Sequence, residues 1–598
     1  MTNNKNGKNI RLQGIAVSPG IIIGKARLVD RSKQKIVYQY IVNEKDLNRE
    51  VERFKNALQV TKDQISAVKN NLPEQLKQHA FILEAHLMIL DDNMVMDATI
   101  KAIMEEKINA EWALKKSVQK VSKIFNEVAD EYIRERFSDV ENVAERILRN
   151  LAGKVQEKIT VTDENVIIVA HNLSPADTTE LNTSKILGFI TDIGGRTSHT
   201  AIMAQALEIP AVVGLETATS VITDGCLLIV DGYKGDVIIN PDINLISAFQ
   251  EKQIYYEKYK SSILRLSYLP SETTDGHRIT LKANIEFVEE ITAAKDHGAE
   301  GIGLYRTEYL YLRSKGIPAE DELFNDYKQV AQTIQPEAVT IRTLDIGGDK
   351  LLSYYQSAKE MNPALGLRAI RFCLKEQDIF RSQLRAILRA SAYGRVRILF
   401  PMISGLQELL DVKKVLAEVM RDLKRRKVEY DHDIKIGIMI EIPSAVTVAD
   451  ILAKHVDFFS IGTNDLIQYA LAIDRVNEHV AFMYEPYHPA VIRMIRQTVK
   501  AARDAGIEVA LCGEMAGDPM CASILLGIGI DELSMTSGSI PLIKKIIRSI
   551  SRKQAMDDLN HIMELTTASE VKMFIEKNLD RFIPDIKDKN ALQPSGNN

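Results

Sequence analysis

The sequence has little of what marks secreted, membrane-spanning or nucleic-acid-binding proteins. Its four cysteines, Cys226, Cys373, Cys512 and Cys521, include no C-x-x-C pair, which argues against a disulfide framework or a zinc knuckle and favours a reducing compartment. The polar start MTNNKNGKNIR lacks the apolar stretch of a signal peptide, and no run of about 18 apolar residues follows it. No long basic block occurs and the net charge is −5, so nucleic acid is a poor candidate partner. We therefore expect a cytoplasmic protein with no membrane insertion.

The bulk composition is that of an ordinary globular protein. Hydrophobic residues make up 45% of the 598 positions and charged residues 26%, and both fractions are typical of chains that fold around a packed core. A chain of this length exceeds what a single core serves, so we expect about three domains.

Hydrophobic patterning divides the N-terminal part of the chain into strands and helices. Short strands are predicted within 10–29, and apolar residues at three- and four-residue spacing predict about four helices between 43 and 151. β-like runs return as ENVIIVA, KILGFIT, AVVG, CLLIVDG and DVIIN. The pattern predicts a small α/β domain of residues 1–30 and 150–242, an inserted helical subdomain at 31–149 and a linker helix within 243–270.

The C-terminal half alternates short apolar runs with amphipathic helical patterns. The runs are RITLKANIEF, EGIGLYRTEY, AVTIRTLDIGG, VRILFPMIS, IKIGIMIEIP, FFSIGTNDL, EVALCGEMAG and ELSMTSGSIP. Eight β-α units in about 300 residues are what a (β/α)8 barrel of the TIM type needs, so we assign residues 271–585 to one. An open doubly wound sheet is the alternative, and the lack of a Gly-rich dinucleotide turn disfavours it. The polar tail 586–598 is predicted to be disordered.

Polar residues follow the predicted barrel strands, where the active site of such a fold lies. They are Asn284, Arg306, Arg342, Glu441, Asn464, Asp465 and Cys512. Guanidinium forks are natural receptors for phosphate or carboxylate oxygens, and two carboxylates together with substrate oxygens are a common way to hold Mg²⁺. The set predicts a site for an anionic phosphate ester that chelates magnesium.

Each of these residues alone has an ordinary structural explanation. An arginine near a strand end is more often part of a surface ion pair, a lone acid is usually a cap or an ion-pair partner, and Cys512 is by itself most simply a small buried hydrophobe. The functional interpretation depends on all of them reaching the same end of one barrel.

A histidine in the N-terminal half sits at a predicted helix start. In GGRTSHTAIMAQALEIP, Gly194 and Gly195 permit a tight turn, Thr197 or Ser198 can cap the helix, and His199 falls in the first turn. Free N–H groups and the helix dipole there stabilise an anion and disfavour the imidazolium, which keeps a nucleophilic nitrogen available. A merely exposed histidine is the alternative, and the predicted phosphate-binding barrel in the same chain makes a phosphoryl carrier the better hypothesis.

The motifs of the chain resemble those of the phosphoenolpyruvate-utilising enzymes, and among these the enzyme I family of the bacterial phosphotransferase system, the phosphoenolpyruvate–protein phosphotransferases. The resemblance runs from GIAVSPGIIIGKA to the last barrel strand, in family order. It rests on GGRTSHTAIMA, GIGLYRTEYL, IRTLDIGGDK, NPALGLRAIR, MIEIPSA, FSIGTNDLIQYALAIDR, YHPAV and CGEMAGDP.

The resemblance assigns roles to single positions. It implies that His199 is phosphorylated through Nε2 and that Cys512 gives a proton to the enolpyruvate carbon. It implies phosphoenolpyruvate binding by Arg306, Arg342, Asn464, Asp465 and Arg475, with Arg368 lining the same mouth, and Mg²⁺ ligation by Glu441 and Asp465. Thr178 is a weaker candidate for orienting the imidazole.

The resemblance also implies partners and leaves rivals open. It implies that the helical insert docks the phosphocarrier protein HPr, and that the protein dimerises through its barrels. Because His199 must serve both sites, the α/β domain is expected to swivel on its connections. Pyruvate phosphate dikinase or phosphoenolpyruvate synthase would carry an ATP-binding domain with a Gly-rich loop, which we do not find. A nitrogen-regulating relative would carry a sensory domain, and a non-enzymatic scaffold would need neither the thiol nor the metal ligands.

Overall fold

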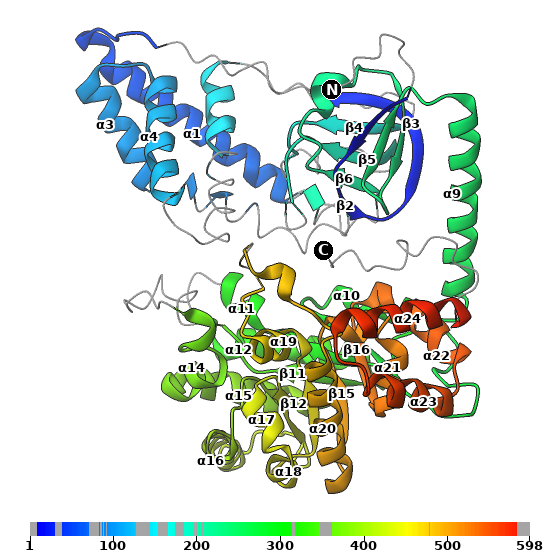
Figure 1. Cartoon of the computed structure of the whole chain (residues 1–598). Helices are drawn as coiled ribbons and strands as arrows, with labels where there is room; N and C mark the ends of the chain where they lie inside the picture. Colours follow the sequence, from blue (N-terminus) through cyan, green and yellow to red (C-terminus); the bar gives the residue numbers. More distant parts are fainter. Residues whose placement is uncertain are drawn as a thin grey trace. The chain divides into compact units, whose positions relative to one another are not determined.

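The computed structural model divides into two compact units, Met1–Lys258 and Tyr259–Asn598, and each is described by itself (Figure 1). Within the described residues, no helix is long and apolar enough to cross a membrane. The structure describes residues 9–29, 39–70, 83, 86–87, 89–90, 93–126, 140, 143–153, 165–173, 185–195, 198, 200–201, 204, 209–313, 317–346, 362–475, 477 and 479–582.

The first unit contains a mixed eight-stranded sheet in the order β1-β8-β7-β3-β4-β5-β6-β2. Strands β3 to β6 run parallel, and the remaining pairs are antiparallel. The strands are β1 (Ile10–Gln13), β2 (Ile15–Ser18), β3 (Ile21–Val29), β4 (Val166–Ala170), β5 (Ile186–Thr191), β6 (Ala211–Val213), β7 (Leu227–Asp231) and β8 (Asp236–Ile239). The two outer strands, β1 and β2, are joined by the single residue Gly14, so the sheet is rolled up.

Strand β4 shows why its sequence is an unbroken apolar run. Val166 and Ile168 face one hydrophobic cluster, while Ile167 and Val169 face another on the opposite side of the sheet. A strand buried on both faces has no polar side to present, and all five residues of β4 are buried.

Helices of the first unit form a separate hydrophobic core. The described ones are α1 (Leu47–Asn70), α3 (Asn93–Glu106) and α4 (Ala110–Asn126), with further helical residues at 143–151. Phe54, Ile103, Leu114 and Ile147 are fully buried in this core. Helix α8 (Ala218–Val221) is short, and the long helix α9 (Ile243–Leu264) corresponds to the helix expected within 243–270.

The second unit is built on a closed barrel of eight strands, all paired in parallel. Each strand falls in one of the eight predicted runs, which confirms the predicted (β/α)8 fold and excludes the open sheet. The strands are β9 (Thr280–Ile285), β10 (Ile302–Tyr305), β11 (Ala338–Arg342), β12 (Arg395–Phe400), β13 (Lys435–Ile440), β14 (Phe458–Ile461), β15 (Glu508–Leu511) and β16 (Glu532–Met535).

Helices surround the barrel strands, and their apolar faces join one large core with the outward side chains of the strands (Figure 1). They are α10 (Glu290–Asp296), α11 (Glu308–Arg313), α12 (Glu320–Ile334), α14 (Ala369–Lys375), α15 (Gln377–Ser391), α16 (Leu406–Arg425), α17 (Pro443–Thr447), α18 (Ala449–Leu452), α19 (Thr463–Leu471), α20 (Pro489–Ala505), α21 (Ala522–Ile528), α22 (Ile540–Ser549), α23 (Arg552–Ile562) and α24 (Ala568–Phe582).

One helical pattern divides differently from its sequence. The run LGLRAIRFCLKEQDIFRSQLRAIL predicts a single amphipathic stretch, but the structure forms α14 and α15 with a break at Glu376, whose φ of −98° and ψ of 66° lie outside the helical region. Both helices bury apolar residues against the barrel, so the break lets one chain segment follow the curved surface with two straight pieces.

Candidate active site

Arg342 is the most enclosed cation at the carboxyl-terminal end of the barrel. It ends β11, its side chain is 13% exposed, and it forms 2.9 Å ion pairs from NH2 to Glu308 Oε1 and from NH1 to Asp345 Oδ2. Its Nε is buried and has no hydrogen-bond partner among the described residues. A buried N–H without a partner is costly, and here it offers a donor to an incoming oxygen.

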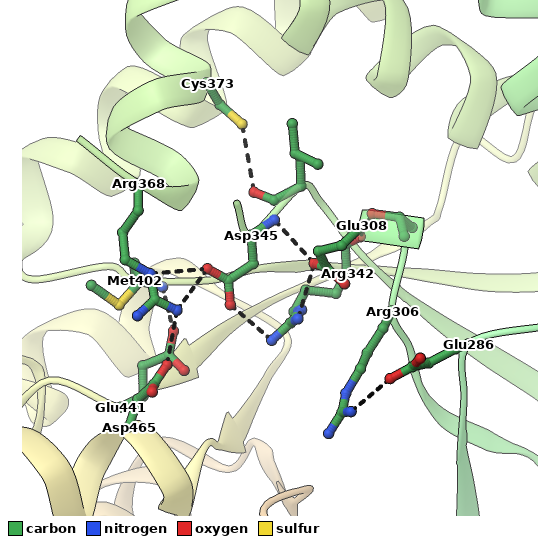
Figure 2. A network of polar contacts seen from close by, with 12 residues as sticks. Glu286, Arg306, Glu308, Arg342, Asp345, Arg368, Cys373, Met402, Glu441 and Asp465 are labelled. Carbon is green, nitrogen blue, oxygen red and sulfur yellow. Dashed lines mark hydrogen bonds and ion pairs between the residues drawn. The ribbon is translucent and has the colours of Figure 1, made fainter. Parts of the chain in front are cut away.

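Asp345 joins Arg342 to a second arginine. Its Oδ1 accepts from Arg368 NH2 at 2.9 Å, and the same nitrogen lies 3.1 Å from Asp465 Oδ2 (Figure 2). Burial alone would raise the pKa of Asp345, but the charges of Arg342 and Arg368 outweigh it and hold this pKa below its ordinary value. Arg368 and Arg342 therefore share one carboxylate, that of Asp345.

Glu441 and Asp465 supply the two carboxylates predicted for this mouth. Glu441 follows β13 and its Oε1 accepts the N–H of Met402 at 2.6 Å, where Met402 has a φ of 58°. Burial, together with the negative charges of Asp465 and Asp345, raises the pKa of Glu441 to about 8.

These carboxylates fit a divalent cation that is completed by other ligands. A cation between Glu441 and Asp465 would relieve the repulsion that raises the Glu441 pKa, and Mg²⁺ prefers such oxygen donors. Glu441 Oε2 lies beside Gly462, where the Cβ of any other residue would come within 2.7 Å. In the described part of the chain, no group of three or more His, Cys, Asp or Glu side chains could hold a metal.

Arg306 is a more exposed cation at the same end of the barrel. It follows β10, its side chain is 40% exposed, and NH1 pairs with Glu286 Oε1 at 2.9 Å. Figure 2 shows this pair beside the network of Arg342. Burial raises the pKa of the Cys512 thiol, and the positive charges of Arg342 and Arg306 both act against that rise.

Asn464 and Arg475 belong to a rim around Tyr484. Asn464 lies in the first turn of helix α19. Its Nδ2 donates to Glu514 Oε1 at 2.9 Å, and its Oδ1 accepts the N–H of Glu514 at 2.8 Å. The Tyr484 hydroxyl donates to the Asn464 carbonyl at 3.5 Å and also bonds the side chain of Arg475. Arg475 is itself exposed, which leaves its charge available to a ligand.

Cys512 lies immediately after β15 and points into the barrel. It packs with Leu304, Leu399, Met439 and Phe458, so the ordinary description as a small buried hydrophobe is also true of it. Burial raises the pKa of the thiol to about 11, against the lowering effects of a hydrogen bond and nearby arginines. The thiol is therefore neutral near pH 7 and can act as an acid.

Two predicted residues lie outside the described part of the chain, His199 and Thr178, and so does the tail 586–598. The predicted cap close to His199 is present, because Ser198 Oγ accepts the N–H of Ala201 at 3.4 Å. Thr200, Ala201 and Ala204 are helical.

Sequence reasoning missed the acidic partners of the arginines. Glu308 and Asp345 stand inside motifs used to recognise the family, but nothing in the strand pattern says which acid meets which arginine. Gln383 was also missed: it is fully buried, accepts the N–H of Leu344 at 2.9 Å and donates to Thr307 and Tyr327 behind the site.

Comparison with known proteins gives the family of the chain. Residues 13–136 match the family described as PEP-utilising enzyme, N-terminal; residues 162–235 match PEP-utilising enzyme, mobile domain; and residues 260–552 match PEP-utilising enzyme, PEP-binding domain. The chain is 44% identical to phosphoenolpyruvate-protein phosphotransferase of Bacillus sp. (strain S), over 95% of this chain and 98% of that protein. It is 43% identical to the proteins of the same name from Geobacillus stearothermophilus and Bacillus subtilis (strain 168), over 95% of this chain and 98% and 99% of theirs. The chain therefore belongs to the phosphoenolpyruvate-utilising enzymes, and within them to the phosphoenolpyruvate–protein phosphotransferases.

Proposed function

We propose that this protein transfers the phosphoryl group of phosphoenolpyruvate to His199, releases pyruvate, and passes the group to a histidine of the phosphocarrier protein HPr. This is the first step of the phosphoenolpyruvate-dependent sugar phosphotransferase system. The observation that carries the proposal is Arg342, which two ion pairs hold at the barrel mouth and whose buried Nε has no hydrogen-bond partner among the described residues.

The mouth matches the charges of phosphoenolpyruvate. Arg306, Arg342 and Arg368 present guanidinium groups to a substrate that carries a phosphate and a carboxylate, and such forks bind either group with two hydrogen bonds. Asn464 and Arg475 at the rim offer further donors. In this proposal Arg306 and Arg342 hold the phosphoryl group.

Glu441 and Asp465 are the residues that would hold Mg²⁺, which when bound supplies positive charge to the substrate's phosphoryl and carboxylate oxygens. Their fit to a hard cation rests on their oxygen donors, and it is supported by the raised pKa of Glu441, which burial and the negative charges of Asp465 and Asp345 produce.

The chemistry divides between two residues of different units. His199 attacks phosphorus in line, and the arginines stabilise the charge on the transferring group. The bond from phosphorus to the enol oxygen breaks and leaves enolpyruvate, whose methylene carbon takes the proton of Cys512. Thr178 is proposed to orient the imidazole.

The domain roles complete the proposal. Residues 1–30 and 150–242 form the domain that carries phosphohistidine, 31–149 dock HPr, 243–270 connect to the barrel at 271–585, and the α/β domain swivels between its two partners. We also propose a homodimer formed through the barrels and a cytoplasmic location.

The test is phosphorylation by labelled phosphoenolpyruvate with Mg²⁺ and without nucleotide. We expect acid-labile, alkali-stable label on the wild-type chain and none on His199→Ala. The matched control is His171→Ala, which removes another histidine of the same unit, one whose Nδ1 bonds Asp192 at 3.1 Å, and which should keep the label. Label that persists in His199→Ala, or a requirement for ATP as in a dikinase or synthase, would refute the proposal. A wild-type chain that takes no label would favour the scaffold hypothesis, and label that does not pass to HPr would refute HPr as the acceptor.

A further inference from the structure

The proton donor assigned above is fixed at its main chain by the barrel. Cys512 N–H donates to Ile461 O at 3.1 Å, and its carbonyl accepts from Asn284 Nδ2 at 2.9 Å. Asn284 is held in turn by Ser534, whose Oγ donates to Asn284 Oδ1 at 2.5 Å. The backbone of Cys512 therefore cannot shift far, and the behaviour of its sulfur depends on the groups around that atom.

The sulfur accepts a hydrogen bond from the hydroxyl of Ser460. Ser460 Oγ donates to Cys512 Sγ at 3.2 Å, while the thiol itself points to Ile461 O at 3.7 Å. Ser460 is 1% exposed and lies on β14 two residues after Phe458, so both side chains face the apolar interior of the barrel.

The burial of the Ser460 hydroxyl has to be explained by the hydrogen bond that it makes. Burying it costs free energy unless a hydrogen bond compensates, and the bond that Ser460 makes is to a neutral thiol, which is a weak acceptor. A thiolate is a far better acceptor, since hydrogen bonds to ionised groups are shorter and stronger than those between neutral ones. The hydrogen bond from Ser460 is thus stronger to the thiolate of Cys512 than to its thiol.

We infer that Ser460 is a positioning residue for proton transfer, which stabilises the Cys512 thiolate formed when enolpyruvate becomes pyruvate. The inference rests on the proposed function. In that step the S–H bond breaks and a C–H bond forms at the methylene carbon, whose π electron pair takes the proton. The sulfur keeps the S–H electron pair, and the Ser460 O–H points at it. The thiolate regains a proton from water after pyruvate leaves.

An interaction that strengthens as charge develops lowers the barrier of the step. Other charges face the same sulfur: Arg342 and Arg306 favour the thiolate, and Glu441 opposes it. Those charges also act on the substrate, whereas Ser460 acts on the sulfur alone, so a Ser460 variant separates proton transfer from binding.

The test follows the reverse proton transfer in the full chain. Unphosphorylated protein is incubated with pyruvate and Mg²⁺ in deuterated water, and deuterium entering the methyl group is measured against pH. Removal of a methyl proton requires the thiolate, so the rate rises with pH and then levels off. For Ser460→Ala we expect an exchange rate lowered about tenfold near neutrality and a midpoint raised by about one pH unit, as loss of one hydrogen bond to an ion predicts.

Two variants control the result. Ser460→Thr keeps the hydroxyl and should keep the wild-type midpoint. Thr498→Val removes a buried hydroxyl that bonds Met494 O at 3.0 Å on helix α20 and should also leave the midpoint in place. If Ser460→Ala does not fold, Ser460→Cys in reducing buffer, with its weaker donor, should also raise the midpoint. A wild-type midpoint in Ser460→Ala, while phosphoenolpyruvate still labels His199, would overturn the inference alone. Absence of label on the wild-type chain would instead overturn the proposed function.

Discussion

Replacing Glu532 by glutamine should destabilise the barrel and leave the first unit, residues 1–258, unaffected. Glu532 begins β16, its side chain is 8% exposed, and its Oε2 accepts from Lys282 Nζ at 2.5 Å. Arg397 NH2 lies 3.0 Å from Oε1 and 2.9 Å from Oε2, and Arg397 also stacks on Phe458, with its guanidinium carbon 4.6 Å from the ring centroid. One carboxylate therefore neutralises two enclosed cations.

The size of the destabilisation follows from the two cations that contact this one carboxylate. In Glu532→Gln the shape is kept, but Lys282 loses its ion-pair partner, and Arg397 keeps only the 3.4 Å pair with the exposed Glu508. One hydrogen bond also meets an amide NH2 that cannot accept it. Breaking a buried ion pair in this way costs about 3–5 kcal/mol. With a urea m-value of about 3 kcal/mol/M, the midpoint of barrel unfolding should fall by about 1 M.

The assay uses the position of the single tryptophan. Trp112 lies in the unit of residues 1–258 and the barrel has no tryptophan. Tryptophan fluorescence therefore reports the first unit, while far-UV circular dichroism reports both the first unit and the barrel. The dichroism transition should shift and the fluorescence transition should not. A shift below about 0.2 M, or equal shifts of both signals, would refute the reasoning.

The pH dependence of this effect has a definite sign. Burial alone would raise the pKa of Glu532, but the charges of Arg397 and Lys282 hold it below its ordinary value. A carboxyl group with a lowered folded-state pKa stabilises above its unfolded pKa and loses this contribution as the pH falls through the folded value. The difference between wild type and Glu532→Gln should therefore be complete at neutral pH and shrink only in the acid range below the ordinary carboxyl pKa.

Three further predictions concern the mouth of the barrel. Because the pKa of Glu441 is raised to about 8, Mg²⁺ binding at pH 7 should release about 0.9 proton, and the affinity should rise with pH until the pH passes 8. Calorimetry in buffers of different ionisation enthalpy measures the proton release. A Mg²⁺ affinity that does not change with pH would contradict the prediction. Cys512→Ala should slow pyruvate formation about 10²–10⁴-fold while phosphoenolpyruvate still binds and labels His199, and lost binding would show that the cysteine is structural. Arg368→Lys loses the planar fork that reaches Asp345, and should raise the KM for phosphoenolpyruvate about tenfold with a smaller effect on kcat; an unchanged KM would exclude a binding role.

The barrel could be predicted from sequence because each of its strands lies in a short, mostly apolar run and amphipathic helical patterns separate these runs. Parallel pairing then brings the carboxyl ends of all strands to one mouth, so Arg342, Glu441 and Cys512 could be placed together before any contact was known. The break between α14 and α15 could not be predicted in this way, because the apolar spacing of the sequence continues through Glu376. The break lets the two helices follow the curved surface of the barrel.

The ion pairs within the barrel mouth could not be predicted from the sequence, for a related reason. Strand register determines which residues emerge, but not which of several nearby acids pairs with a given arginine, and Glu308 and Asp345 became visible only through their distances to Arg342. Ser460 did leave a signal: a hydroxyl within the apolar run FFSIG marks a polar group inside a barrel. The roles of the individual site residues stay predictions.

The unequal settings of Arg342 and Arg306 have an entropic consequence. Arg342 has already lost its rotamer freedom on folding, through two buried ion pairs, so no further ordering opposes substrate when it binds there. Arg306, 40% exposed with an exposed partner, must be ordered at the moment of binding, at a cost of about 1 kcal/mol for a long side chain. In the proposed reaction, Arg342 would thus present a fixed template for the phosphoryl group, and Arg306 would adjust as the group leaves its donor oxygen.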